Sequence, residues 1–134
     1  EQYNRNRLLW SDPDVDGIKT GHTDAAGYCL VASKKREHMR LISVLFNAKT
    51  NMQRAEDSDR LLTYGFSFYT SQLIYKKGDI LGKTRVWFGD KKDLPVSVAQ
   101  DLYVTLPKQQ YKQLKAVLEI PKTLKAPITK DQSI

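Results

Sequence analysis

The sequence contains one cysteine, Cys29, and no long hydrophobic run. A single cysteine permits no internal disulfide, so cysteine usage does not indicate a redox compartment. No apolar stretch approaches the roughly 18 residues that span a bilayer, which predicts no transmembrane helix in these 134 residues. Residues 1–5 lack the charged and then apolar halves of a signal peptide, so we expect any export signal to lie outside this chain.

Acidic residues are scarce in the second half. Residues 1–66 carry 10 basic and 9 acidic side chains, residues 67–134 carry 12 and 6, and the net charge is +7. The simplest interpretation is a solvated, lysine-rich surface, and the second is contact with an anionic membrane surface or wall polymer. The sequence has no nucleic-acid-binding motif and turns interrupt its lysines, so nucleic acid is not expected as a partner.

The first half alternates apolar and polar residues between short turns. This pattern predicts strands over 15–23, 28–33 and 39–46, with a charged turn at 34–38. The short links favour an antiparallel meander with the first strand at or next to an edge. We expect Asn51 to cap a helix that runs to about residue 66 and lies on the sheet.

The second half consists of short β-type segments divided by turn residues. They predict a small all-β part that lacks its last strands. The expected strands cover residues 73–75, 80–88, 96–98, 102–106 and 114–120. The fold class expected for the whole chain is therefore α+β.

Residues 15–23 place Lys19, Thr20, Gly21 and His22 in immediate succession on the first predicted strand. A cation, a hydroxyl and a position without a side chain can turn a strand edge into a binding site. Lys-Thr-Gly is one of three motifs found in penicillin-binding proteins and class A β-lactamases. A tripeptide alone is a weak signal, so the flanking residues must decide.

With its flanks, the chain resembles the low-molecular-mass penicillin-binding proteins that are serine-type D-alanyl-D-alanine carboxypeptidases. The resemblance is carried, in order, by residues 15–24, 26–28, 30–33, 40–44 and 86–90. It implies that residues 1–68 are the C-terminal part of a transpeptidase-like catalytic domain, with antiparallel strands and one packed helix. Residues 69–134 would be the N-terminal part of the small, all-β accessory domain.

Two motifs of this family are missing from the chain. No serine begins a Ser-x-x-Lys sequence, which holds the family's nucleophile, and none begins Ser-x-Asn. The family's terminal amphipathic membrane helix is also absent. We therefore expect a fragment that acylates nothing by itself, from a parent protein that is periplasmic or extracytoplasmic and peripheral at the cytoplasmic membrane.

The resemblance implies hydrolysis of the terminal D-Ala-D-Ala bond of peptidoglycan stem peptides through an acyl-enzyme, the step that β-lactam antibiotics mimic. Lys19 and His22 would take part in catalysis: the lysine would hold the hydrogen-bond network of the nucleophile, and the His22 backbone N–H would be one oxyanion donor. The Thr20 hydroxyl would bind the substrate carboxylate. Gly21 would leave room for the peptide to add as an antiparallel strand.

Recognition of a free carboxylate favours arginine, whose guanidinium can bind it with two parallel hydrogen bonds. Arg5 and Arg54 match positions where the family carries carboxylate-side arginines, with one apparent deletion before Val15 in the alignment. Both are therefore candidate substrate-binding residues.

Other interpretations stay open at this stage. The chain could be a non-catalytic, β-rich basic module that binds a partner or, through its second domain, an anionic membrane surface. Asp12, Asp14 and Asp16 alternate like metal ligands but lack the glycine and distal glutamate of a calcium loop. No metal or organic cofactor is expected.

Overall fold

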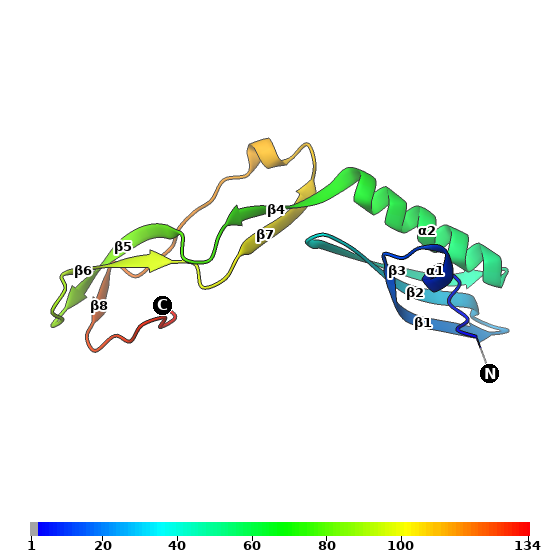
Figure 1. Cartoon of the computed structure of the whole chain (residues 1–134), viewed down its shortest axis with the longest axis horizontal. Helices are drawn as coiled ribbons and strands as arrows, with labels where there is room; N and C mark the ends of the chain where they lie inside the picture. The colour runs from blue at the N-terminus through cyan, green and yellow to red at the C-terminus, as the bar shows by residue number, and fades with distance from the viewer. Residues whose placement is uncertain (1–2) are drawn as a thin grey trace. The chain divides into compact units, whose positions relative to one another are not determined.

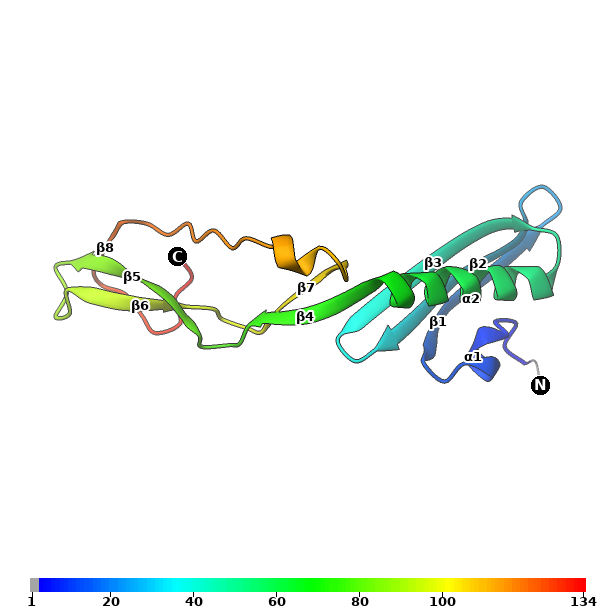
Figure 2. The same cartoon turned by 90° about the horizontal axis from the view of Figure 1, so that it is seen from above.

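The computed structural model describes residues 3–134, which form two units. The first unit runs to Ser71 and also contains Thr105–Gln109; the second comprises Gln72–Val104 and Gln110–Ile134. Figures 1 and 2 show the elements of each unit. In this part of the chain, no helix is long and apolar enough to cross a membrane.

The first unit is built on a three-stranded antiparallel sheet. Its strands are β1 (Val15–Thr23), β2 (Gly27–Arg36) and β3 (Met39–Ala48), in the order β1-β2-β3. The predicted meander is confirmed, and β1 is an edge strand. The β1–β2 turn ends at Gly27, whose φ is +62° and where a Cβ would lie 2.9 Å from Asn47 Cα. Glycine is therefore needed there for both backbone conformation and space.

Helix α2 (Asn51–Phe68) covers one face of this sheet (Figure 2). Its N-cap is Thr50, whose Oγ1 accepts a hydrogen bond from Gln53 N at 3.0 Å. The predicted cap, Asn51, is wrong by one residue. Threonine and asparagine are both good capping residues, and here the Asn51 side chain instead accepts a hydrogen bond from Arg54.

The core of the first unit lies between α2 and the sheet. Leu30, Ala32 and Leu62 are at most 2% exposed, and Leu8 of the short, unpredicted helix α1 (Leu8–Ser11) joins them. The other face of the sheet has no cover within the described residues. It exposes apolar side chains of β3, namely Ile42, Val44 and Phe46.

The second unit contains most of the short strands. Strands β4 (Tyr69–Tyr75) and β7 (Leu102–Pro107), each of which has residues in both units, form a two-stranded sheet. Strand β5 (Ile80–Trp87) lies between β6 (Asp93–Ser97), which is antiparallel to it, and β8 (Thr123–Lys125), which is parallel. Pro95 lies inside β6, where it is tolerated because β6 is an edge strand.

The predicted strand over residues 114–120 is wrong. This segment is extended but joins no sheet, and it follows a 3-10 turn at Tyr111–Gln113. Two of its side chains, those of Leu118 and Ile120, instead lie against Gly82 of β5. A Cβ on Gly82 would lie 2.9 Å from Leu118 and 3.5 Å from Ile120. These two apolar residues therefore pack over a glycine, and the segment pairs with no strand.

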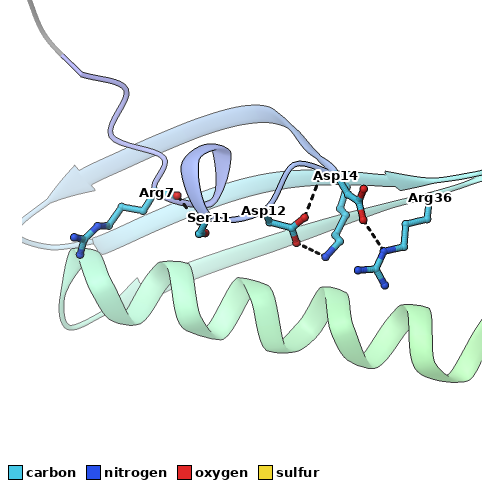
Figure 3. A network of polar contacts seen from close by, with 6 residues as sticks. Arg7, Ser11, Asp12, Asp14 and Arg36 are labelled. Carbon is cyan, nitrogen blue, oxygen red and sulfur yellow. Dashed lines mark hydrogen bonds and ion pairs between the residues drawn. The ribbon is translucent and has the colours of Figure 1, made fainter.

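Three ion pairs join the residues before and within β1 to the next two strands. They are Asp12–Lys34, Asp14–Arg36 at 2.8 Å and Asp16–Arg40 at 2.7 Å; Figure 3 shows the surroundings of the first two. The predicted turn at 34–38 is too long, because Lys34, Lys35 and Arg36 belong to β2. Lys34 is only 2% exposed, so its ammonium depends on Asp12 for charge compensation.

The Asp12–Lys34 pair gives a pH-dependent prediction. Burial tends to raise the pKa of Asp12, but the hydrogen bond and charge of Lys34 outweigh it, and the pKa lies below its usual value. A carboxyl with a lowered folded-state pKa stabilises the fold above its unfolded pKa of about 3.9, and this is lost as the pH falls through the folded value. Asp12→Asn should therefore cost about 3 kcal/mol at pH 7, and less as the pH falls below about 3.9.

Urea unfolding at pH 7 and pH 3 measures this difference. Asp14→Asn is the matched control, because Asp14 and Arg36 are both more than one-third exposed and their pair should contribute at most about 0.5 kcal/mol. Equal effects of the two substitutions at pH 7 would contradict the role given to the buried pair.

Candidate functional site

The predicted site residues Lys19, Thr20, Gly21 and His22 lie together near the end of β1, on the open edge of the sheet. Lys19 and His22 are exposed, and Thr20 is half-buried. The Lys19 ammonium donates a hydrogen bond to its neighbour's carbonyl, Thr20 O, at 2.9 Å. No strand of the described chain pairs with the outer side of β1, so its outward N–H and C=O groups can accept another strand.

The fold itself does not require glycine at position 21. A Cβ built there would meet only Cys29 Cβ, at 3.7 Å, which is an ordinary van der Waals distance. The backbone of Gly21 also lies outside the left-handed region. Gly21 therefore leaves open space beside the edge strand, although a side chain would fit there.

The ring of His22 packs on the ring of Tyr28, its partner across the β1–β2 pair. The two ring centroids are 4.0 Å apart, with an interplanar angle of 41°. The guanidinium of Arg54 lies over Tyr28, with Cζ 5.5 Å from the ring centroid. Tyr28 thus connects the exposed imidazole to a buried cation and restricts where the imidazole can point.

Arg54 is 3% exposed and binds four groups of the chain. Its Nη1 donates to Gly21 O at 3.1 Å and Cys29 O at 3.3 Å. Its other donors reach Arg5 O at 3.3 Å and Asn51 Oδ1 at 3.0 Å. Burial lowers the pKa of Arg54, although an arginine stays protonated. Four of its five N–H donors are therefore used within the protein.

Arg5 lies in the segment before α1 and has an exposed side chain. Its carbonyl is held by Arg54, and the next residue, Asn6, is buried. Asn6 Nδ2 donates to Gly17 O at 3.2 Å, and its Oδ1 accepts from Leu8 N at 3.2 Å. These bonds fix the Arg5 backbone beside β1 while its guanidinium stays at the surface.

Two open hollows lie elsewhere on the first unit. Neither is lined by the Lys-Thr-Gly residues. One lies between α1 and α2 and includes Trp10, Met52 and Glu56; the other lies beside the first residues of the chain and includes Arg5 and Asn51. The Lys-Thr-Gly residues therefore lie outside both hollows, on an edge strand of the sheet.

Two family models match the chain. Residues 1–50 match the D-alanyl-D-alanine carboxypeptidase family, and residues 69–134 match the C-terminal domain of penicillin-binding protein 5. Only residues 51–68, which form α2, lie outside both matches. This chain belongs to the low-molecular-mass serine D-alanyl-D-alanine carboxypeptidase family.

Individual relatives agree with this assignment. D-alanyl-D-alanine carboxypeptidases DacA and DacC of Escherichia coli K12 are 44% and 45% identical over 135 residues, covering 99% of this chain. The crystal structure of penicillin-binding protein 5 from Haemophilus influenzae matches 98% of the chain with a TM-score of 0.78 and 40% identity. The chain spans 34% of each curated relative and 39% of that solved chain, about a third of their length.

Sequence reasoning missed three residues that shape the site. Tyr28 carries the His22 ring, Asn6 fastens the Arg5 segment to β1, and Asn51 holds Nε of Arg54. The strand register gave a usable signal for Tyr28, because it lies opposite His22 across a short turn. No local pattern indicates the other two. Asn6 donates to Gly17 O, which is 11 residues away, and Asn51 accepts from the side chain of Arg54.

Proposed function

We propose that this chain supplies the substrate-binding edge of a serine D-alanyl-D-alanine carboxypeptidase. The observation that carries the proposal is the unpaired edge of β1 with Lys19, Thr20 and Gly21 exposed or half-buried along it, in a chain of this family. The nucleophile belongs to a part of the polypeptide beyond these residues. Residues 1–68 would then end the catalytic domain, and residues 69–134 would begin the β-rich accessory domain.

A stem peptide binds to this edge as an added antiparallel strand. Main-chain hydrogen bonds give the peptide its register, and the missing side chain at Gly21 lets its backbone come close. The scissile carbonyl then lies near the backbone N–H of His22, one of the two oxyanion donors. Removing one such donor typically costs about 3 kcal/mol of transition-state stabilisation.

Positive charge at the edge selects a free carboxylate. The Thr20 hydroxyl and the exposed Arg5 guanidinium bind the terminal carboxylate, and the Lys19 ammonium lowers the energy of the deprotonated nucleophile. Direct contact between Arg54 and the substrate was predicted from the sequence. With four of its donors already in use, we assign Arg54 the positioning of Gly21 and Arg5.

Peptidoglycan stem peptides and β-lactams are the proposed ligands of the whole protein. Both present an acyl group next to a carboxylate, so both fit the same edge. Peptidoglycan lies outside the cytoplasm, which places the protein in the periplasm or an equivalent compartment, at the outer face of the cytoplasmic membrane. The basic second half of the chain, with 12 basic and 6 acidic side chains over residues 67–134, is the part proposed to meet an anionic surface.

The test uses the complete gene product that contains this chain. Incubation with benzylpenicillin, followed by intact mass and peptide mapping, should show one covalent adduct on a serine outside residues 1–134. Lys19→Met should slow acylation about 100-fold, because the nucleophile loses its electrostatic support. Lys35→Met, on the neighbouring strand β2 and also exposed, is the matched control and should acylate at the wild-type rate.

Two results would overturn the proposal. One is the absence of any adduct on the folded, complete protein, which would favour the non-catalytic basic module. The other is wild-type acylation by Lys19→Met, which would contradict the electrostatic role given to Lys19 at this edge.

A further inference from the structure

Two aromatic residues lie where β5 ends and the turn to β6 begins: Trp87 is the last residue of β5, and Phe88 follows it. Figure 1 shows the course of this turn. Phe88 is 87% exposed, the largest exposed fraction among the exposed large hydrophobic side chains of the described residues, and Trp87 is 45% exposed. Single exposed apolar residues are common on protein surfaces. What distinguishes this turn is the backbone that holds Phe88 and the charge around it.

Phe88 has a φ of +64°, in the left-handed region that bulky residues rarely adopt. The turn is nevertheless firmly held. Val86 N donates to Lys92 O at 2.8 Å, and Ala126 N, just after β8, donates to Trp87 O at 2.9 Å. A glycine at position 88 would adopt this conformation without strain. The chain thus keeps a strained aromatic side chain that has almost no contact with its own fold, which points to a contact with something else.

Basic side chains surround the aromatic pair. Arg85 stacks on Trp87, with Cζ 4.5 Å from the ring centroid, and Lys125 is the partner of Trp87 across the β5–β8 pair. The turn itself contributes Lys91 and Lys92. The acidic residues of the hairpin end are Asp90 and Asp93, so cations outnumber anions.

We propose that this aromatic–basic turn, defined as Arg85–Asp93 with Lys125, is a contact site for anionic phospholipid headgroups. Phe88 and Trp87 enter the boundary between headgroups and acyl chains, and the lysines bind lipid phosphates. A stable protein partner needs about 800 Å² on each side, far more than the tip of one hairpin offers. The inference rests on the proposed location at the membrane, and it concerns residues that take no part in acylation.

Vesicle co-sedimentation of the 134-residue chain tests the proposal. Vesicles of phosphatidylglycerol and phosphatidylcholine should bind the chain at least 10-fold better than pure phosphatidylcholine, and binding should weaken with salt. Phe88→Gly should reduce binding about 10-fold yet unfold at the same or a higher temperature, because it removes the strained conformation. A merely structural role of Phe88 predicts the opposite change in melting temperature.

Matched controls lie at the other end of the same hairpin. Ile80→Ser removes an apolar side chain that is 65% exposed at the start of β5, and it should leave vesicle binding unchanged. Lys91→Gln/Lys92→Gln should weaken binding to anionic vesicles about 10-fold, whereas Lys76→Gln/Lys77→Gln should not.

In a Trp10→Phe background, Trp87 is the one tryptophan left, and its emission should shift to shorter wavelength with anionic vesicles. Binding by Phe88→Gly equal to wild type, or no binding by the wild type, would overturn the inference. Penicillin acylation of the complete protein is a separate readout, so failure here is distinguishable from failure of the proposed enzyme function.

Discussion

Replacing Arg54 with methionine is expected to lower the free energy of unfolding by about 3 kcal/mol. Methionine keeps an unbranched apolar stem but removes every hydrogen bond to Gly21 O, Cys29 O and Arg5 O. These hydrogen bonds are partly buried, and a buried carbonyl left without a donor costs about 1–3 kcal/mol, so three partly buried ones together should cost about 3 kcal/mol. Because these carbonyls belong to β1, β2 and the segment before α1, the loss also loosens the geometry of the predicted site.

Urea unfolding followed by circular dichroism measures this change. Arg60→Met is the matched control on the same helix, because the Arg60 side chain is 78% exposed and its ion pair with Asp57, at 3.7 Å, is weak. It should change stability by less than about 0.5 kcal/mol.

Peptide kinetics distinguish a positioning role from a direct substrate contact. If Arg54 positions the strand, Arg54→Met should impair turnover of substrates with a free or an amidated terminal carboxylate alike, together with stability. Wild-type stability combined with a loss specific to the free carboxylate would contradict the positioning role and identify Arg54 as the substrate arginine.

Local sequence patterns predicted the parts of the fold that depend on neighbouring residues. Turn residues between apolar strands gave the β1-β2-β3 meander, and helical periodicity after residue 50 gave α2 on the sheet. In contrast, Lys34 was placed in a turn because lysines are usually solvated. Its partner, Asp12, is 22 residues away, and only the folded chain brings them together.

Strand pairing at long sequence separation was the other source of error. β8 pairs in parallel with β5, from Arg85↔Thr123 to Trp87↔Lys125, and no local signal shows this register. Residues 114–120 have the composition of a strand, yet they join no sheet, and two of them, Leu118 and Ile120, lie against Gly82. Which apolar segment joins a sheet was therefore decided by tertiary packing.

The candidate site also has one part that follows from neighbouring residues and another that depends on contacts between distant segments. Lys19, Thr20, Gly21 and His22 are consecutive, so their sequence alone predicts that they lie along one strand. The surroundings of Arg54 join four separate segments, and its burial was not predictable from a helical position next to polar residues. The sequence thus predicted that these four residues lie along one strand, but not the contacts that hold the strand in place.

The second large effect is expected from Gly21→Val. The fold has room for a side chain at this position, because a Cβ would meet only Cys29 Cβ at 3.7 Å, so stability should stay within about 0.5 kcal/mol of wild type. A branched side chain next to the open edge should instead prevent an incoming peptide from pairing with β1. A displacement of about 1 Å at the reacting centre can reduce the rate about 100-fold.

The most direct test of the peptide-binding edge is the acylation rate constant of the complete protein carrying Gly21→Val, measured with benzylpenicillin and with a D-Ala-D-Ala peptide. Lys35→Val places the same side chain at an exposed position of β2 and serves as the control. We predict a loss of at least about 100-fold for Gly21→Val with unchanged urea unfolding, and no loss for Lys35→Val. Wild-type rates for the folded Gly21→Val protein would contradict substrate binding along the edge of β1.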